Sequence, residues 1–184
     1  MGNASRVDFG FSSAPPEVDE RHEFEIVRLG PGKKIRGIVL SEHLICRETH
    51  YVQKRTVPHH ETGCPYCLAN EQKRWYGWVA LFSPTSGNTC ILEFPAKPLA
   101  TFVKWQKERG SLRGVELAAR RRGREINGPV FVDLSHGTMA VDCLPAGPDV
   151  QLCLLRMWGF DPGLPGLGVA VARHHRLNGH EVSQ

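Results

Sequence analysis

The sequence predicts an all-β fold with one helix, and three observations lead to this prediction. Short runs rich in β-branched and aromatic residues recur through the middle of the chain, with turn residues between them. One run, 98–110, instead carries apolar residues at helical spacing. A polar stretch of histidines and cysteines interrupts the strands and has little apolar periodicity of its own.

Each element follows from a local pattern. The expected strands are 22–30, 33–45, 74–83, 89–94, 112–120 and 129–135. Aromatic and small residues alternate in 74–83, and the turn residues that follow join it to 89–94 as a hairpin. Pro98 belongs in the first turn of the helix, and Gly110 is placed to end it. Segment 148–159 fits either a helix or a last strand.

Leaving out the first short run, the order is three strands, one helix and two strands. This is the order of an OB-fold, a five-stranded Greek-key barrel with a helix between the third and fourth strands. We therefore predict an OB-fold domain over 23–160 with a long loop inserted at 46–70. Composition predicts a flexible leader over 1–22 and a disordered tail over 161–184.

The charge is small overall but unevenly spread. Lys and Arg total 23 and Asp and Glu total 19, a net charge of +4. Residues 33–125 contain seventeen basic and eight acidic groups, net +9, whereas 1–32 carry −3 and 126–184 carry −2. A basic middle indicates a polyanionic partner, with a merely solvated basic surface as the alternative.

Several classes of protein are disfavoured. The longest charge-free stretch, 75–92, is interrupted by glycine and proline, so we expect no membrane-spanning helix. The first residues lack the apolar run of an export signal, so we expect a cytoplasmic protein. No Walker loop, nucleophile elbow or H-E-x-x-H motif occurs, and we expect no enzymatic activity.

The strongest local signal is the pair Cys64 and Cys67, because a Cys-x-x-Cys turn can direct two thiolates at one Zn²⁺ ion. His59 is the expected third ligand, and the fourth is His50 or Cys46, with a slight preference for His50. A bound ion would also explain how a polar loop of this length is ordered.

The tetrad Cys-Pro-Tyr-Cys is also that of the glutaredoxins, which makes thiol–disulfide exchange an alternative. That family places the tetrad at the start of a helix in a βαβ layout and a Thr-Val-Pro downstream of it. Here Thr56-Val57-Pro58 lies upstream of the cysteines, and no βαβ pattern follows. We therefore favour a metal site.

Aromatic and basic residues surround this segment. Rings that stack on bases, with cations on the phosphates, are the usual means of binding single-stranded nucleic acid. Stacking is predicted for Trp75, Tyr76 and Trp78. Phosphate contacts are predicted for Lys54, Arg55, Lys73, Arg74, Arg120, Arg121, Arg122 and Arg124.

Residues 33–135 resemble the zinc-containing OB-fold single-stranded-DNA-binding proteins, of which the helix-destabilising proteins of tailed phages are members. The resemblance is architectural, and Cys64 and Cys67 match the Cys-x-x-Cys pair of that family. It implies a bacterial or phage-like setting, DNA rather than RNA, and a role in DNA replication, repair or recombination. Homo-oligomers or replication and recombination proteins are the partners implied. The competing hypothesis is a zinc-stabilised adaptor that binds another protein.

Overall fold

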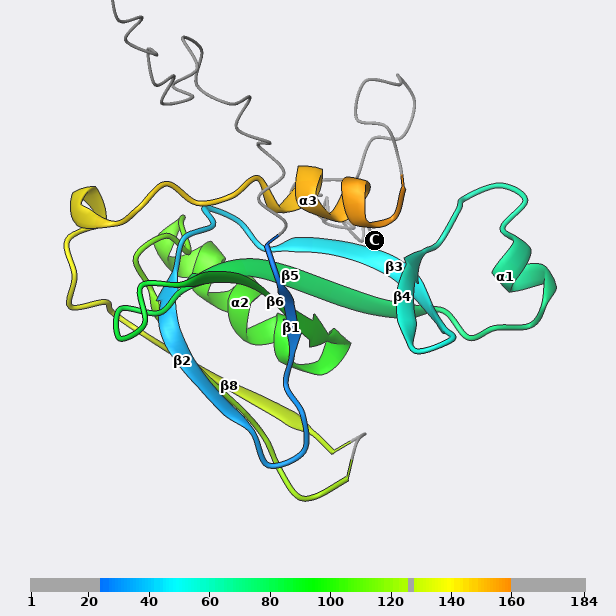
Figure 1. The fold of residues 1–184 in the computed structure, drawn as a ribbon, viewed down its shortest axis with the longest axis horizontal. Coiled ribbons are helices and arrows are strands. Elements are labelled where there is room, and N and C mark those ends of the chain that lie inside the picture. Colours follow the sequence, from blue (N-terminus) through cyan, green and yellow to red (C-terminus); the bar gives the residue numbers. More distant parts are fainter. Residues whose placement is uncertain (1–23, 126–127, 160–184) are drawn as a thin grey trace, which may run out of the picture.

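The structure is a computed structural model that describes residues 24–125 and 128–159. The predicted leader (1–22) and tail (161–184) lie outside the described residues. Figure 1 shows strands that form one strongly curved sheet, with helices on either side of it. The strands are β1 (Ile26–Arg28), β2 (Lys34–Val39), β3 (Ile45–Val52), β4 (Arg55–Pro58), β5 (Arg74–Phe82), β6 (Thr89–Pro95), β7 (Glu116–Arg121) and β8 (Val130–Ser135). The helices are α1 (Pro65–Leu68), α2 (Ala96–Arg109), the 3₁₀ turn η1 (Val141–Cys143) and α3 (Val150–Met157).

The sheet is organised around β5, which is nine residues long. On one side β5 pairs with β6 over most of its length. On the other side its first half pairs with β3 and its last two residues pair with β2. The main path of the sheet is β1-β6-β5-β2-β7-β8, and the β3–β4 hairpin branches from it.

The predicted fold class is confirmed at the coarse level, because the described chain is mostly β with few helices. The longest of these helices, α2, lies between β6 and β7. The closed barrel is not seen. The outer edge of β6 pairs in parallel with β1 rather than with β8, so the sheet is open and mixed. Helix α2 lies on the concave side of the curved sheet (Figure 1). It packs against β5, β6 and β8.

Two predicted segments are wrong in detail. The single strand expected over 33–45 is interrupted at residues 40–44, which separate β2 from β3. Both strands pair with β5, β2 with its end and β3 with its first half. The segment 46–70 is not a loop without structure. It contains most of β3, all of β4 and the short helix α1.

Both faces of the sheet are covered, because alternate residues of β5 face two different hydrophobic clusters. Val79 packs with Phe102 of α2 in the first cluster. Trp78 packs with Leu154 of α3 in the second cluster. Segment 148–159 is thus a helix at α3, capped by the Asp149 carboxylate, which accepts a 2.9 Å hydrogen bond from the N–H of Leu152.

Among the described residues, no helix combines the length and the apolar character needed to cross a membrane.

Candidate metal centre and its basic surroundings

Residues 45–73 form an arm that contains β3, β4 and α1. The first half of β3 joins the arm to the sheet by pairing with β5, and α1 extends beyond the sheet (Figure 1). His50 lies on β3 opposite Val57 of β4. His59 directly follows β4, and its N–H extends the hairpin by donating a 3.0 Å bond to the carbonyl of Glu48. The hairpin therefore brings together two histidines that are nine residues apart in the sequence.

The two cysteines are set by the turn that precedes α1. Gly63 has a φ of +61°, a conformation that glycine adopts without strain. Cys64 is the N-cap of α1, and Pro65 occupies the first turn with its fixed φ. Cys67 follows about one turn later, so both sulfurs face the same side of the short helix.

Four ligand atoms converge between the β3–β4 hairpin and α1. His50 Nε2 lies 3.1 Å from His59 Nδ1, and the sulfurs of Cys64 and Cys67 lie 3.4 and 3.6 Å from the same His50 nitrogen. Cys67 Sγ is also 3.5 Å from His59 Nδ1. A tetrahedron with metal–ligand bonds of about 2.0–2.3 Å has edges of roughly 3.3–3.8 Å. The four side chains could therefore hold one metal ion, and their spacing is compatible with zinc.

The electrostatics of the cysteines suit such a site. Burial opposes ionisation of Cys64, but hydrogen bonds from the backbone of His60 and Cys67 and from the His59 ring outweigh it and lower the pKa of Cys64 to about 5. Desolvation and the neighbouring Cys64 sulfur raise the pKa of Cys67. The lowered pKa of Cys64 favours its thiolate, which is the form of cysteine that binds a metal ion.

Cys46, the alternative fourth ligand, lies outside this group. It is on β3 beside Gly77 of β5 and packs against the hydrophobic cluster under α2. Burial raises the pKa of its thiol to about 11. Among the described residues, the group that could hold an ion therefore contains His50 and not Cys46.

The predicted stacking residues have different environments. Trp75 is 49% exposed at the start of β5, opposite Glu48 of β3. Tyr76 is half-buried against the cluster under α3. Trp78 is fully buried, and its indole N–H donates a 3.2 Å bond to the carboxylate of Glu93. Trp78 is therefore a core residue and cannot stack on a base, which corrects the prediction for this position.

The basic residues predicted near the arm are exposed there. Lys73 forms an ion pair of 3.4 Å with Glu48, and Arg74 bonds to the side-chain oxygen of Gln72 at 3.2 Å. Lys54 and Arg55 lie at the tip of the β3–β4 hairpin. The arm therefore carries cations at both its hairpin tip and its return to the sheet.

The predicted arginines 120–124 lie on a separate part of the sheet, at the β7–β8 turn (Figure 1). Arg122 and Arg124 are exposed, and Arg120 lies over the ring of Phe131 at 5.4 Å. Arg121 differs, because it donates to the backbone carbonyls of Leu29 and Gly128. Arg121 thus holds the turn in place, and its guanidinium is already engaged by the protein.

Sequence reasoning missed two residues beside the arm. Arg28 of β1 pairs with the buried Glu93 at 2.7 Å and bonds to the Thr56 hydroxyl. Trp158, after α3, donates a 3.0 Å bond to the carbonyl of Thr56. A tryptophan in a Gly- and Pro-rich region is unusual, and this could have marked Trp158 as a residue with a specific contact. Nothing in the sequence distinguishes Arg28 from the other arginines.

No protein-family model matches the chain, and comparisons with curated proteins and with solved structures gave no match either.

Proposed function

We propose that the chain is a non-catalytic protein that binds single-stranded nucleic acid, with DNA preferred, and that a structural zinc ion stabilises its arm. The observation that carries the proposal is the placement of Trp75. Its half-exposed ring follows Lys73 and Arg74 directly, at the point where the arm ordered by the ligand cluster rejoins the sheet.

Zinc is the ion that this ligand set fits best, because two thiolates and two imidazoles in a tetrahedron are a common structural zinc site. Four protein ligands complete its coordination, so no position is left open for a reacting water. The ion would contribute folding energy to the arm. With both sulfurs bound to the ion, the cysteine pair would not be free for thiol–disulfide exchange.

The nucleic-acid part of the proposal depends on charge and ring exposure. An exposed aromatic ring beside cations can stack on any base while the cations neutralise phosphates. The exposed Arg122 and Arg124 add a second basic region at the β7–β8 turn. The strand and helix order of an OB-fold, here without closure of the barrel, fits the same function.

The test is a titration of the purified full chain with oligothymidine, followed by tryptophan fluorescence at low and moderate salt, with zinc measured by mass spectrometry. We expect one zinc per chain, quenching on binding, and weaker binding as salt rises. Trp75→Ala should weaken binding about tenfold, since one stacked base contributes about 1–3 kcal/mol. No quenching at low salt would contradict the proposal.

Val103→Ala is the matched control, because Val103 is 44% exposed but lies on α2, away from the arm. We expect it to leave the oligothymidine affinity unchanged. If Trp75→Ala lowers the melting temperature and leaves the affinity intact, Trp75 has a structural role and the stacking proposal is wrong.

A second candidate function is that of a protein-interaction adaptor. Leu68 favours it, since this leucine is 81% exposed at the end of α1 on the arm. An exposed apolar residue on an ordered projection is typical of a contact with another protein. Zinc binding without any oligonucleotide binding would favour this candidate.

A further inference from the structure

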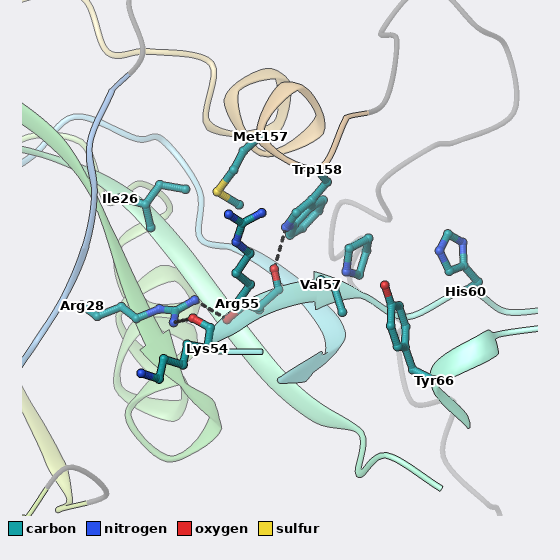
Figure 2. Close-up of a pocket in the computed structure, with 11 residues that line it drawn as sticks. Ile26, Arg28, Lys54, Arg55, Val57, His60, Tyr66, Met157 and Trp158 are labelled. Atoms are coloured by element: carbon teal, nitrogen blue, oxygen red, sulfur yellow. Dashed lines mark hydrogen bonds between the residues drawn. The ribbon is translucent and has the colours of Figure 1, made fainter. Parts of the chain in front are cut away.

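A pocket of about 550 Å³ lies between the arm and the rest of the molecule (Figure 2). Four elements form its walls: β1, β4, the end of α3, and α1 of the arm. Tyr66, which stands between the two cysteine ligands, contributes one wall, and its ring lies 5.5 Å from that of His50. The candidate metal centre therefore positions Tyr66 at one side of the pocket, although none of the four candidate ligands lines the pocket.

Cations line the hairpin side of the pocket. Lys54 and Arg55 are exposed, and in Figure 2 the Arg55 side chain extends towards Met157 and Trp158. The guanidinium of Arg28 also lines the pocket, but its charge is offset by Glu93. Over residues 24–125 and 128–159, no acidic side chain forms an ion pair with Lys54 or Arg55.

The turn that presents these cations is conformationally costly. Gln53 and Lys54 join β3 to β4 as a two-residue loop, with φ values of +49° and +64°. Asparagine and glycine are the residues that fit such a turn with least strain. Lys54 lines the pocket, although its side chain extends away from Met157 and Trp158 in Figure 2. An exposed lysine held in this backbone conformation is consistent with a binding role.

Another wall of the pocket is apolar. Trp158 is fixed by its bond to the Thr56 carbonyl and by an edge contact with the ring of Trp78 at 5.7 Å. Met157, which is 48% exposed, and Ile26 lie beside it. A thioether and an indole form a surface against which a flat ring can pack.

We propose that this pocket binds one nucleotide of a bound strand, with the phosphate on Lys54 and Arg55 and the base against Met157 and Trp158. A plain anion would not need the apolar wall, and an apolar ligand would not need two exposed cations. The volume lies within the range of small-molecule sites, which is about 300–1,000 Å³. The inference rests on the proposed function, because it gives the same strand a further contact, on the α3 side of the sheet.

The test uses the zinc-loaded full chain and three probes: thymidine 5′-monophosphate, thymidine and inorganic phosphate. The indole N–H signal of Trp158 in a ¹H–¹⁵N spectrum, assigned with Trp158→Phe, reports binding in the pocket. We expect the monophosphate to shift this signal and to bind at least about tenfold more tightly than either thymidine or phosphate, because only it uses both walls. Equal binding of phosphate would show a simple anion site, and equal binding of thymidine would show that the cations contribute nothing; either result overturns the proposal.

The double variant Lys54→Asn with Arg55→Gln removes both cations, and asparagine tolerates the backbone conformation at position 54. It should weaken monophosphate binding about tenfold or more. The control, Lys104→Gln with Lys107→Gln, removes the same charge from the exposed side of α2 and should change nothing. Unchanged monophosphate binding in the first variant, with its zinc content and melting temperature intact, would also overturn the proposal. If the variant fails to fold, Arg55→Gln alone is measured instead.

Oligothymidine separates this inference from the function on which it rests. If the wild type binds oligothymidine but the Trp158 signal does not respond to the monophosphate, the pocket proposal is wrong and the strand-binding function stands. If the monophosphate binds and oligothymidine does not, the strand-binding function is wrong. The proposal that the nucleotide belongs to a bound strand is then wrong as well.

Discussion

The Nδ1 atom of His50 lies 3.1 Å from the backbone carbonyl oxygen of Glu71. Because a carbonyl only accepts hydrogen bonds, Nδ1 must carry the proton, and the lone pair of Nε2 then faces His59 and the cysteines. A contact of this kind fixes the tautomer and ring orientation of a metal-binding histidine. His50 is also fully buried, so the protein orients this side chain before an ion arrives.

The first prediction follows from that contact. His50→Ala should lower the affinity for zinc by roughly 100-fold or more, since it removes an oriented ligand. Competition with a chromogenic chelator measures the affinity. His60→Ala is the matched control, because His60 neighbours the ligand His59 but is not in the ligand group, and it should keep one zinc per chain. Equal losses in the two variants would contradict the assignment of His50 as a ligand.

The second prediction concerns the buried Glu93. This carboxylate accepts bonds from Trp78 and Thr56 and pairs with Arg28. Glu93→Gln should lower the free energy of unfolding by about 2 kcal/mol, less than for a fully buried pair because Arg28 is 38% exposed. Urea denaturation measures it. Glu108→Gln, which breaks the exposed pair with Lys104, should cost less than about 0.5 kcal/mol. Similar costs at both positions would show that burial of the carboxylate is unimportant.

The third prediction concerns the reactivity of Cys46. A pKa raised by burial from 9.0 to about 11 leaves its thiolate fraction at pH 8 roughly 100-fold below that of an unperturbed thiol. Because the thiolate is the reacting form, iodoacetamide should modify Cys46 far more slowly than the exposed Cys143. Mass spectrometry of digested samples over time gives both rates. Raising the pH towards 10 should accelerate the reaction of Cys46, and fast modification at pH 8 would show that this residue is not buried in solution.

The fourth prediction concerns the β7–β8 turn. If Arg122 and Arg124 each neutralise one phosphate, replacing both with glutamine should reduce the salt slope of oligothymidine binding by about 1.4, or about 0.7 per contact. Lys104→Gln with Lys107→Gln is the control of equal charge, and its slope should equal that of the wild type. An unchanged slope in the arginine variant would remove the turn from the binding surface.

The fifth prediction is that Arg121, in the same turn, contributes to stability and not to binding. Because it bonds to the carbonyls of Leu29 and Gly128, Arg121→Gln should lower stability by about 1–3 kcal/mol through lost charged hydrogen bonds. Thermal denaturation of this variant beside Arg122→Gln separates the structural arginine from the exposed one. Equal melting temperatures would contradict the structural role.

Local patterns predicted the local features well. Strands 74–83 and 89–94 are found as β5 and β6, and the helix expected over 98–110 is found over 96–109, because alternation, turn residues and capping act over a few residues. The Cys64 and Cys67 turn was predictable for the same reason. The choice between His50 and Cys46 was not, because both lie on the same face of β3 by alternation. It depends on which part of the strand lies beside β4 and α1, and that is the part that contains His50, whereas Cys46 pairs with β5.

The environment of Trp78 shows a second limit. Alternation along β5 gives two faces, but the sequence does not say that α3 covers the second one. The pocket beside the arm could not be predicted from the sequence either. It depends on a hydrogen bond between Trp158 and Thr56, which are 102 residues apart. Contacts at that separation are decided by the packing of the whole domain.

The short strand β1 has a consequence for any shortened version of the chain. Its three residues cover the outer side of β6, and Arg28 at its end binds both Glu93 and the hairpin of the arm. Deleting the chain through Arg28 would uncover a row of unpaired N–H and C=O groups on β6, which could template the addition of a strand from another molecule. Truncated forms should therefore self-associate at the β6 edge.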